Sequence, residues 1–301
     1  MSTSESPEQK EPSDAPNERP TTVSTDKSTE AGDTGVSSQG SWTDFLPSPI
    51  FVLLLGMIGF TGWLSWNAVE LDWAGEDTPV TPLIPPLLIF LGWIVSGAVH
   101  EFGHALAAYL AGDKSLRGSG YLRLNPFAFG ETFTGTILPV LYLGFGGFGM
   151  TGPASHIDWD RISGRGRRVL VALAGPLASL LLATLLAVVV SILVPSDSVS
   201  TNWAIASMAF LSLANLSAAL INLLPIPGVD MFDAVAPERR WVSVARTNAL
   251  FGSVAVFAIL WFPIVNVRFD DALLALVDLL TPNPAFPELA FHGRLLMQFW
   301  A

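Results

Sequence analysis

Cysteine is absent from the 301-residue sequence, so disulfide bonds and thiolate metal ligands are excluded. Charged residues are also scarce: they make up 14% of the chain, whereas half of all residues are apolar. Histidine occurs only four times. The absence of cysteine leaves the redox compartment open, but the excess of apolar residues makes their distribution along the chain the first question to answer.

The apolar residues gather in runs rather than spreading evenly. A run of about 20 residues is long enough to cross a hydrocarbon core of roughly 30 Å. The five runs of this kind are 48–66, 84–110, 168–194, 203–224 and 248–265. They predict an all-α polytopic membrane protein with about five transmembrane helices embedded in a lipid bilayer.

The N-terminal segment 1–45 has the opposite character. It carries nine acidic and three basic residues, and it is rich in Ser, Thr, Pro and Glu. Such a composition buries too little apolar surface to offset the entropy of ordering, so we expect a disordered acidic tail. It lacks the basic start and short apolar core of a signal peptide. Its acidity argues against a nucleic-acid partner.

The expected organisation is therefore an acidic tail over 1–45, a transmembrane domain over 46–268 and an amphipathic C-terminal tail over 269–301. Loop charges give its orientation, because lysine and arginine collect in cytoplasmic loops. Bases are absent from 69–83 and from 195–202. Basic residues concentrate in the segments 112–134, 150–168 and 231–247. We expect these basic segments and the N-terminal tail to lie inside a cell membrane.

A shorter apolar run, "GTILPVLYLGFGGFG" at 135–149, lies between two of the basic segments. If it crossed the membrane, one basic flank would lie outside. It is short, and Pro139 and several glycines interrupt it. A re-entrant segment buried in protein satisfies both observations. The alternative is an ordinary sixth span.

The second apolar run, 84–110, contains the candidate metal-binding and catalytic residues. His100, Glu101 and His104 are the only Asp, Glu, His, Lys or Arg residues between Asp77 and Asp113. On a helix, residues four apart project from one face, so the two histidines can bind one zinc ion. Glu101 would then lie beside the metal and take a proton from the attacking water. The bare pattern can arise by chance, but three polar residues at bilayer depth require a functional reason.

A catalytic zinc takes three protein ligands and keeps one position open. The fourth run ends in "ALINLLPIPGVDMFD", where Pro225 and Pro227 break the helix before Asp230. By the loop charges, this end and the end of the His100–His104 span are both cytoplasmic. Asp230 is therefore a candidate third ligand, and Asp233 is its rival.

Other polar residues admit two interpretations. Ser212, Asn215 and Asn222 share one side of the fourth run, as a lining for a water-accessible cavity or as partners in interhelical hydrogen bonds. Gly175 and Ser179 lie four apart; the small-residue packing role is preferred for Gly175, while Ser179 could direct its hydroxyl into the site. Two further histidines carry no site assignment: His156, expected at the surface of a basic loop, and His292, in the C-terminal tail.

Three motifs together resemble the site-2 protease family of intramembrane zinc metalloproteases. They occur in the family's order within residues 84–235: His100-Glu-Phe-Gly-His104, Gly175-x-x-x-Ser179 and Asn222-Leu-Leu-Pro-Ile-Pro-Gly-Val-Asp230. The resemblance implies one zinc ion held by His100, His104 and Asp230, with Glu101 as catalytic base. It also implies that "GFGGFGMTGP" at 144–153 is a membrane-embedded β segment and that Ser179 and Asn222 line the site or support the transition state.

The chain departs from the family pattern in two places. Met231 stands where the family usually has glycine after the third ligand, and Ser179 stands where many members have asparagine. No folded extramembrane domain such as a PDZ or CBS module is expected. Twelve arginines against three lysines suggest a GC-rich, prokaryotic genome.

The function expected from the resemblance is zinc-dependent hydrolysis of peptide bonds within or near the transmembrane segments of membrane-protein substrates, as in regulated intramembrane proteolysis. Two other classes are kept as alternatives. The first is an inactive relative that acts as a membrane scaffold, although a scaffold has no need of Glu101. The second is a metal transporter, for which ligands would be expected on both sides of the bilayer.

Overall fold

A computed structural model describes residues 42–68, 83–129, 132–152, 156–196, 198–235, 244–245 and 247–298. The predicted acidic tail lies almost entirely outside these residues, as does most of the acidic loop 69–83. Every regular element in the described part of the chain is helical, in agreement with the expected all-α class. Short 3-10 turns occur at Trp42–Phe45, Lys114–Leu116, Pro126–Ala128 and Trp159–Arg161.

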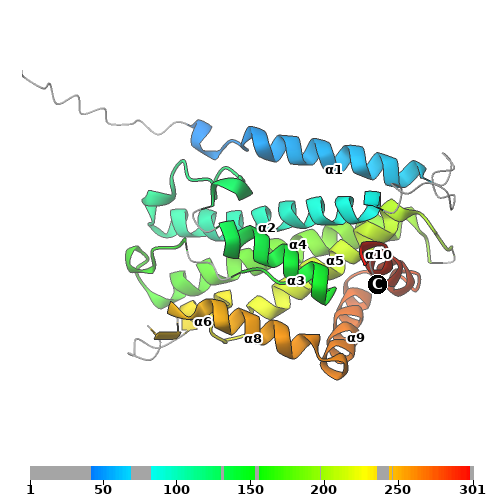
Figure 1. Cartoon of the computed structure of the whole chain (residues 1–301). Coiled ribbons are helices and arrows are strands. Elements are labelled where there is room, and N and C mark those ends of the chain that lie inside the picture. Colours follow the sequence, from blue (N-terminus) through cyan, green and yellow to red (C-terminus); the bar gives the residue numbers. More distant parts are fainter. Residues whose placement is uncertain are drawn as a thin grey trace, which may run out of the picture. The chain divides into compact units, whose positions relative to one another are not determined.

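Four helices are long and apolar enough to cross a membrane. They are α1 (Pro49–Asn67), α2 (Ile84–Ala111), α4 (Arg165–Leu193) and α5 (Trp203–Asn222). Each matches a predicted apolar run to within a few residues, and in Figure 1 they run side by side. The sequence thus predicted these four helices, each a candidate span, correctly.

Local sequence accounts for the ends of these helices. The Ser48 hydroxyl accepts a hydrogen bond from the backbone N–H of Phe51 and so caps α1. Pro85 and Pro86 lie in the first turn of α2, where their missing N–H groups cost nothing. Gly112 ends α2 with φ of 131°, a conformation that residues with a Cβ rarely adopt. This stop directs the chain into the basic segment that follows.

Burial separates the four helices into an inner and an outer pair. The apolar stretch of α5 is 83% buried and that of α2 is 67% buried, against 22% for α1 and 28% for α4. Large apolar side chains on the outer pair are exposed, including Leu53 and Phe60 on α1 and Leu181 and Ile192 on α4. A bilayer is the solvent that such a surface requires. Within the inner pair, α2 carries the predicted ligands His100 and His104, and the chain after α5 leads to Asp230.

The predicted fifth span is bent. The helix α8 (Ala249–Trp261) ends after 13 residues, and α9 (Pro263–Leu280) turns away from it by 90°. Phe262 adopts an extended conformation, as residues before proline prefer, and this breaks the helix. The described chain therefore has four candidate spans, or five if the bent pair counts as one.

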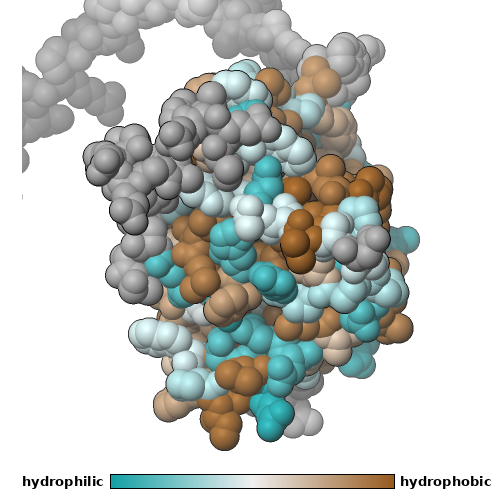
Figure 2. All heavy atoms as spheres, turned by 90° about the vertical axis from the view of Figure 1, so that its right-hand side faces the viewer, coloured by the Kyte–Doolittle hydropathy of each residue, from teal (hydrophilic) through white to brown (hydrophobic). Residues whose placement is uncertain are grey.

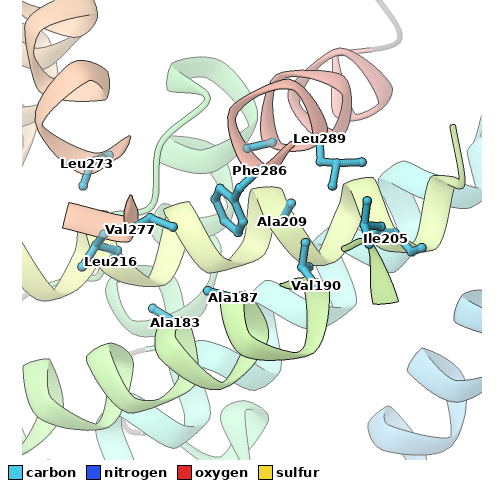
Figure 3. Packing of buried hydrophobic residues seen from close by; sticks show 12 residues of the cluster. Ala183, Ala187, Val190, Ile205, Ala209, Leu216, Leu273, Val277, Phe286 and Leu289 are labelled. Carbon is cyan, nitrogen blue, oxygen red and sulfur yellow. The ribbon is translucent and has the colours of Figure 1, made fainter. Parts of the chain in front are cut away.

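The C-terminal helices close one side of the bundle. The helix α10 (Phe286–Met297) and α9 pack against α4 and α5 around a shared apolar core (Figure 3). Ala183 and Ala187 of α4 face Ala209 of α5, and Phe286 of α10 fills the space beside them. Figure 2 shows the end of the molecule where α9 and α10 lie, with hydrophilic and hydrophobic residues intermixed. The predicted division into a membrane domain and a tail at residue 269 falls inside α9.

The short apolar run at 135–149 forms a π-helical turn (Phe133–Ile137) followed by α3 (Leu138–Gly146). These 14 residues are fewer than the roughly 20 that a span needs. The suggested β structure is not found: residues 147–152 have no regular secondary structure, Gly147 is left-handed with φ of 68°, and no strand occurs among the described residues. Side chains occupy the carbonyls that a strand neighbour would use, since Ser217 donates to Gly149 and Arg294 donates to Gly147.

The two basic segments that flank this run meet at one end of the helices. Asp113 accepts a hydrogen bond from the backbone of Asp158 and lies 3.9 Å from the Arg161 guanidinium. The start of α1 lies at the same end, because Ser48 donates its backbone N–H to the Arg123 carbonyl. At the other end, Asn202 donates to the carbonyl of Trp66. Segments predicted to share one side of the membrane thus lie at the same end of the helices.

Candidate metal centre

Three side chains of metal-binding type converge where α2 meets the short helix α6 (Asp230–Val235). The Nε2 atoms of His100 and His104 lie 3.2 Å apart. Asp230 Oδ2 lies 3.0 Å from the first and 3.1 Å from the second. Both histidines are fully buried, and Asp230 is 4% exposed. The structure therefore brings together the two ligands predicted from the helical spacing and the carboxylate preferred over Asp233.

The spacing of these three atoms suits zinc. A four-coordinate zinc with bonds of about 2.0–2.2 Å separates its ligand atoms by roughly 3.3 Å. Two imidazole nitrogens and one carboxylate oxygen are a known catalytic ligand set. Although burial alone would raise the pKa of Asp230, the neighbouring His104 and His100 hold it below its usual range. Asp230 is therefore ionised, which is the state that binds a cation.

Each imidazole is oriented by a partner on α4. His104 donates from Nδ1 to the backbone carbonyl of Val171 at 2.8 Å. His100 Nδ1 lies 2.9 Å from the Ser179 hydroxyl oxygen. Partners of this kind fix the ring and its tautomer, leaving Nε2 free for a metal. Ser179, predicted to point toward the site, thus contacts a ligand from behind rather than the open position.

Gly175 has a larger role than the packing role that the sequence favoured. A Cβ atom placed on Gly175 would lie 2.1 Å from His104 Nε2 and 2.7 Å from His100 Nε2. No real side chain fits at these distances, so the two ligand nitrogens occupy the space above this glycine. The helical spacing of Gly175 and Ser179 was visible in the sequence, but the face that they present to α2 was not.

Glu101 is buried beside the ligand group but does not belong to it. His156 lies next to Glu101. This corrects the prediction that His156 lies at the surface of a basic loop. That imidazole is 5% exposed, and its Nδ1 lies 3.3 Å from Glu101 Oε2. The loop after α3 folds back over α2 and carries His156 into the site. No local sequence pattern marks this contact.

The polar residues of α5 divide between the two interpretations. Ser212 donates to the carbonyl of Ala183 on α4, and Asn215 donates to the Ser96 hydroxyl on α2, so both make interhelical hydrogen bonds. Asn222 donates to the Thr151 hydroxyl at 2.6 Å and thereby holds the segment 147–152. A role for Asn222 in the transition state stays a prediction. The side chain of Asp233 lies outside the described part of the structure.

Comparison with known proteins gives a family for this arrangement. Residues 87–200 match the model of "Peptidase family M50". A protein of Mycobacterium tuberculosis named "Putative zinc metalloprotease Rip2" is 35% identical over 277 residues, which cover 88% of this chain and 99% of the relative. A protein of the same name in Mycolicibacterium smegmatis is 32% identical and covers 85% and 95%.

A more distant relative is the Bacillus subtilis protein named "Putative zinc metalloprotease YwhC". It is 32% identical over 209 residues, which cover 64% of this chain and 90% of the relative. No solved structure matches the chain. The extent of the mycobacterial matches, together with the buried ligand group, confirms the resemblance seen in the sequence. The chain belongs to peptidase family M50, the site-2 protease family of intramembrane zinc metalloproteases.

Proposed function

We propose that this zinc metalloprotease holds one zinc ion through His100, His104 and Asp230 and uses Glu101 as its catalytic base. The observation that carries the proposal is the buried triangle of two Nε2 atoms and one carboxylate oxygen, with edges of 3.0–3.2 Å. A zinc ion bound there would polarise the scissile carbonyl and lower the pKa of a water molecule. Family membership makes peptide hydrolysis within the membrane the reaction to be explained.

Glu101 is the residue placed to move the proton. It follows His100 on α2, so its carboxylate lies beside the ligand group without joining it. In the proposed reaction, Glu101 accepts a proton from the attacking water and delivers it to the leaving amine. Ser179 and the Val171 carbonyl hold the two imidazoles in place while this occurs.

The substrate class proposed is a membrane protein with a transmembrane helix. A helical substrate must unwind before its scissile amide can be reached, because its backbone is already hydrogen-bonded. Residues 147–152 have no regular secondary structure and pair with no strand among the described residues, so they are proposed to hold the unwound chain through the backbone groups that Ser217 and Arg294 do not occupy. Pairing of two extended backbones is a general mode of peptide recognition.

The proposed site lies toward the cytoplasmic face. Asp230 follows the end of α5, and the neighbouring segments 112–129 and 156–165 carry basic residues. The same one-ended placement argues against a metal transporter, which would need ligands along a path through the bilayer. Among the described residues, the His100–His104–Asp230 group is the one that could hold a metal ion.

Reconstitution in liposomes tests the proposal. The probe is a tagged polypeptide with one transmembrane helix, and two assays are run on the same vesicles: peptide-bond cleavage and zinc flux. We expect zinc-dependent cleavage within or next to the hydrophobic segment, and no flux. Zinc flux without cleavage would favour a transporter, and binding of the helix with neither activity would favour a scaffold.

A further inference from the structure

His156 was not assigned any role by the motifs, yet it is among the most enclosed polar side chains near the site. Its imidazole is 5% exposed, and the Glu101 side chain that it faces is 6% exposed. Nδ1 lies 3.3 Å from Glu101 Oε2, within ion-pair distance, but among the described residues neither Glu101 Oε2 nor His156 Nε2 has a hydrogen-bond partner. Buried polar groups are nearly always hydrogen-bonded, so the unpartnered Oε2 points to His156 Nδ1, the nitrogen within 3.3 Å of it, as its donor.

Aromatic stacking fixes the plane of this imidazole. The His156 ring stacks on Tyr121 at 3.8 Å between centroids with an angle of 13°, and Tyr121 stacks on Phe129 at 4.5 Å and 3°. Tyr121 and Phe129 belong to the segment after α2, and His156 to the segment after α3. The stack therefore joins the two loops and restrains the plane of the imidazole, while its Nδ1 edge lies 3.3 Å from Glu101.

The protonation state of His156 decides whether the Nδ1 atom that faces Glu101 can donate a hydrogen bond. Burial, and beyond it the nearby His104, lowers the pKa of His156 to about 3. The imidazole is therefore neutral at physiological pH and carries a single N–H. A general base must be ionised before it takes a proton, and an ionised Glu101 can only accept, so the His156 tautomer that pairs with it has its proton on Nδ1.

We infer that His156 is a positioning residue for Glu101: from this 3.3 Å contact a small rotation of the side chains lets Nδ1 donate a hydrogen bond to the unpartnered Oε2, so that Oε1 is the oxygen that exchanges protons with water and substrate. The inference rests on the proposed role of Glu101 as base. A carboxylate on a helix rotates about several bonds, and a general base works only within hydrogen-bond reach of the proton that it takes. Support of a catalytic group by a neighbour of this kind is typically worth about 10–100-fold in activity.

Two substitutions separate positioning from packing. The variant His156→Phe keeps an aromatic ring for the stack on Tyr121 but has no donor. The variant His156→Asn loses the ring but places an amide N–H near the position of Nδ1. If His156 positions Glu101, kcat falls about 10–100-fold in His156→Phe and recovers most of that loss in His156→Asn. If His156 only packs, the order of the two variants is reversed.

The experiment measures kcat, KM and bound zinc for these variants, using purified full-length protein and a fluorescently tagged single-span helix in vesicles. We expect unchanged KM and zinc content with reduced kcat in His156→Phe. The matched control is His292→Phe on α10, which should behave as the unmodified protein. Should His156→Phe fail to fold, His156→Gln replaces it, because its longer side chain carries the amide to the position of Nε2 rather than Nδ1.

Each outcome decides the matter. Unchanged kcat in His156→Phe, or activity in His156→Asn as low as in His156→Phe or His156→Gln, would overturn the inference. Glu101→Gln is measured in parallel: if it stays active, the proposed function fails. If Glu101→Gln is inactive while His156→Phe has unchanged kcat, only the inference about His156 fails.

Discussion

Gly175 is the residue whose replacement should affect the metal centre most directly without removing a ligand. A single methyl group at this position would lie 2.1 Å from His104 Nε2. We predict that Gly175→Ala lowers zinc affinity at least about tenfold, because an imidazole displaced from its ideal position binds the metal poorly. The measurement is bound zinc per chain in purified protein.

Gly166→Ala on the same helix is the matched control, since a Cβ there meets nothing within 4 Å. Both variants replace glycine with a better helix former, so they should change helix propensity in the same direction. Equal zinc content in the two variants would show that the space above Gly175 is not needed by the ligands.

Asp230 and Asp233 provide a second comparison at the residue scale. Asp230 Oδ2 lies within 3.1 Å of both imidazoles, which makes it the proposed third ligand. We predict that Asp230→Ala loses most of its bound zinc, as His100→Ala and His104→Ala should, whereas Asp233→Ala retains it. Zinc retained by Asp230→Ala and lost from Asp233→Ala would show that Asp233, not Asp230, is the carboxylate ligand.

The sequence predicted part of this centre for reasons that are local. His100 and His104 are four residues apart on one helix, so the spacing itself places them on one face. The contact between Glu101 and His156 depends instead on how the loop after α3 folds over α2, which no periodicity encodes. The same applies to Gly175, whose neighbours are set by the approach of α4 to α2.

At the scale of secondary-structure elements, Arg294 links the C-terminal helix to the segment 147–152 after α3. Its guanidinium donates to the Gly147 carbonyl at 2.9 Å and to Asp270 of α9 at 2.6 Å. Both are charge-assisted hydrogen bonds, and their loss leaves a carbonyl and a carboxylate without this donor. We predict that Arg294→Met destabilises the protein by about 1–3 kcal/mol, seen as a lower Tm in detergent.

Arg268→Met on α9 is the control for that variant. The Arg268 side chain is 82% exposed and its ion pair with Asp271 spans 3.7 Å, so its removal should change Tm little. An equal loss of stability in the two variants would mean that the bond to Gly147 does not hold the segment in place.

The elements themselves were predicted unevenly. The four straight candidate spans follow from runs of apolar residues, because a run of this kind determines how long the helix is and favours lipid around it. The bend after α8 follows from Pro263, a local signal that the predicted span 248–265 ran across without a break. The suggested β segment at 144–153 came from family resemblance, whereas the described chain holds residues 147–152 through side chains of α5 and α10.

At the scale of the whole molecule, the arrangement of helix ends predicts a topology that can be measured. The basic segments before and after α3 meet at one end of the bundle, so residues 133–146 should enter and leave on the same side. Single cysteines can be introduced without background because the chain has none. We predict that cysteines at Ser119 and Ser163 are labelled only from the cytoplasm, and a cysteine at Thr78 only from outside. Labelling of Ser119 and Ser163 from opposite sides would make the run a span.

The central claim is that a buried carboxylate beside a zinc site performs proton transfer in peptide hydrolysis within a membrane. The most direct measurement is cleavage of a single-span helix in liposomes by zinc-loaded Glu101→Gln protein, compared with the unmodified protein and with Glu288→Gln at an exposed position of α10. Because the amide cannot accept a proton, we predict at least a roughly 10²–10⁴-fold loss of cleavage in Glu101→Gln alone, with zinc content unchanged. Cleavage at the unmodified rate by a zinc-replete Glu101→Gln protein would contradict the account.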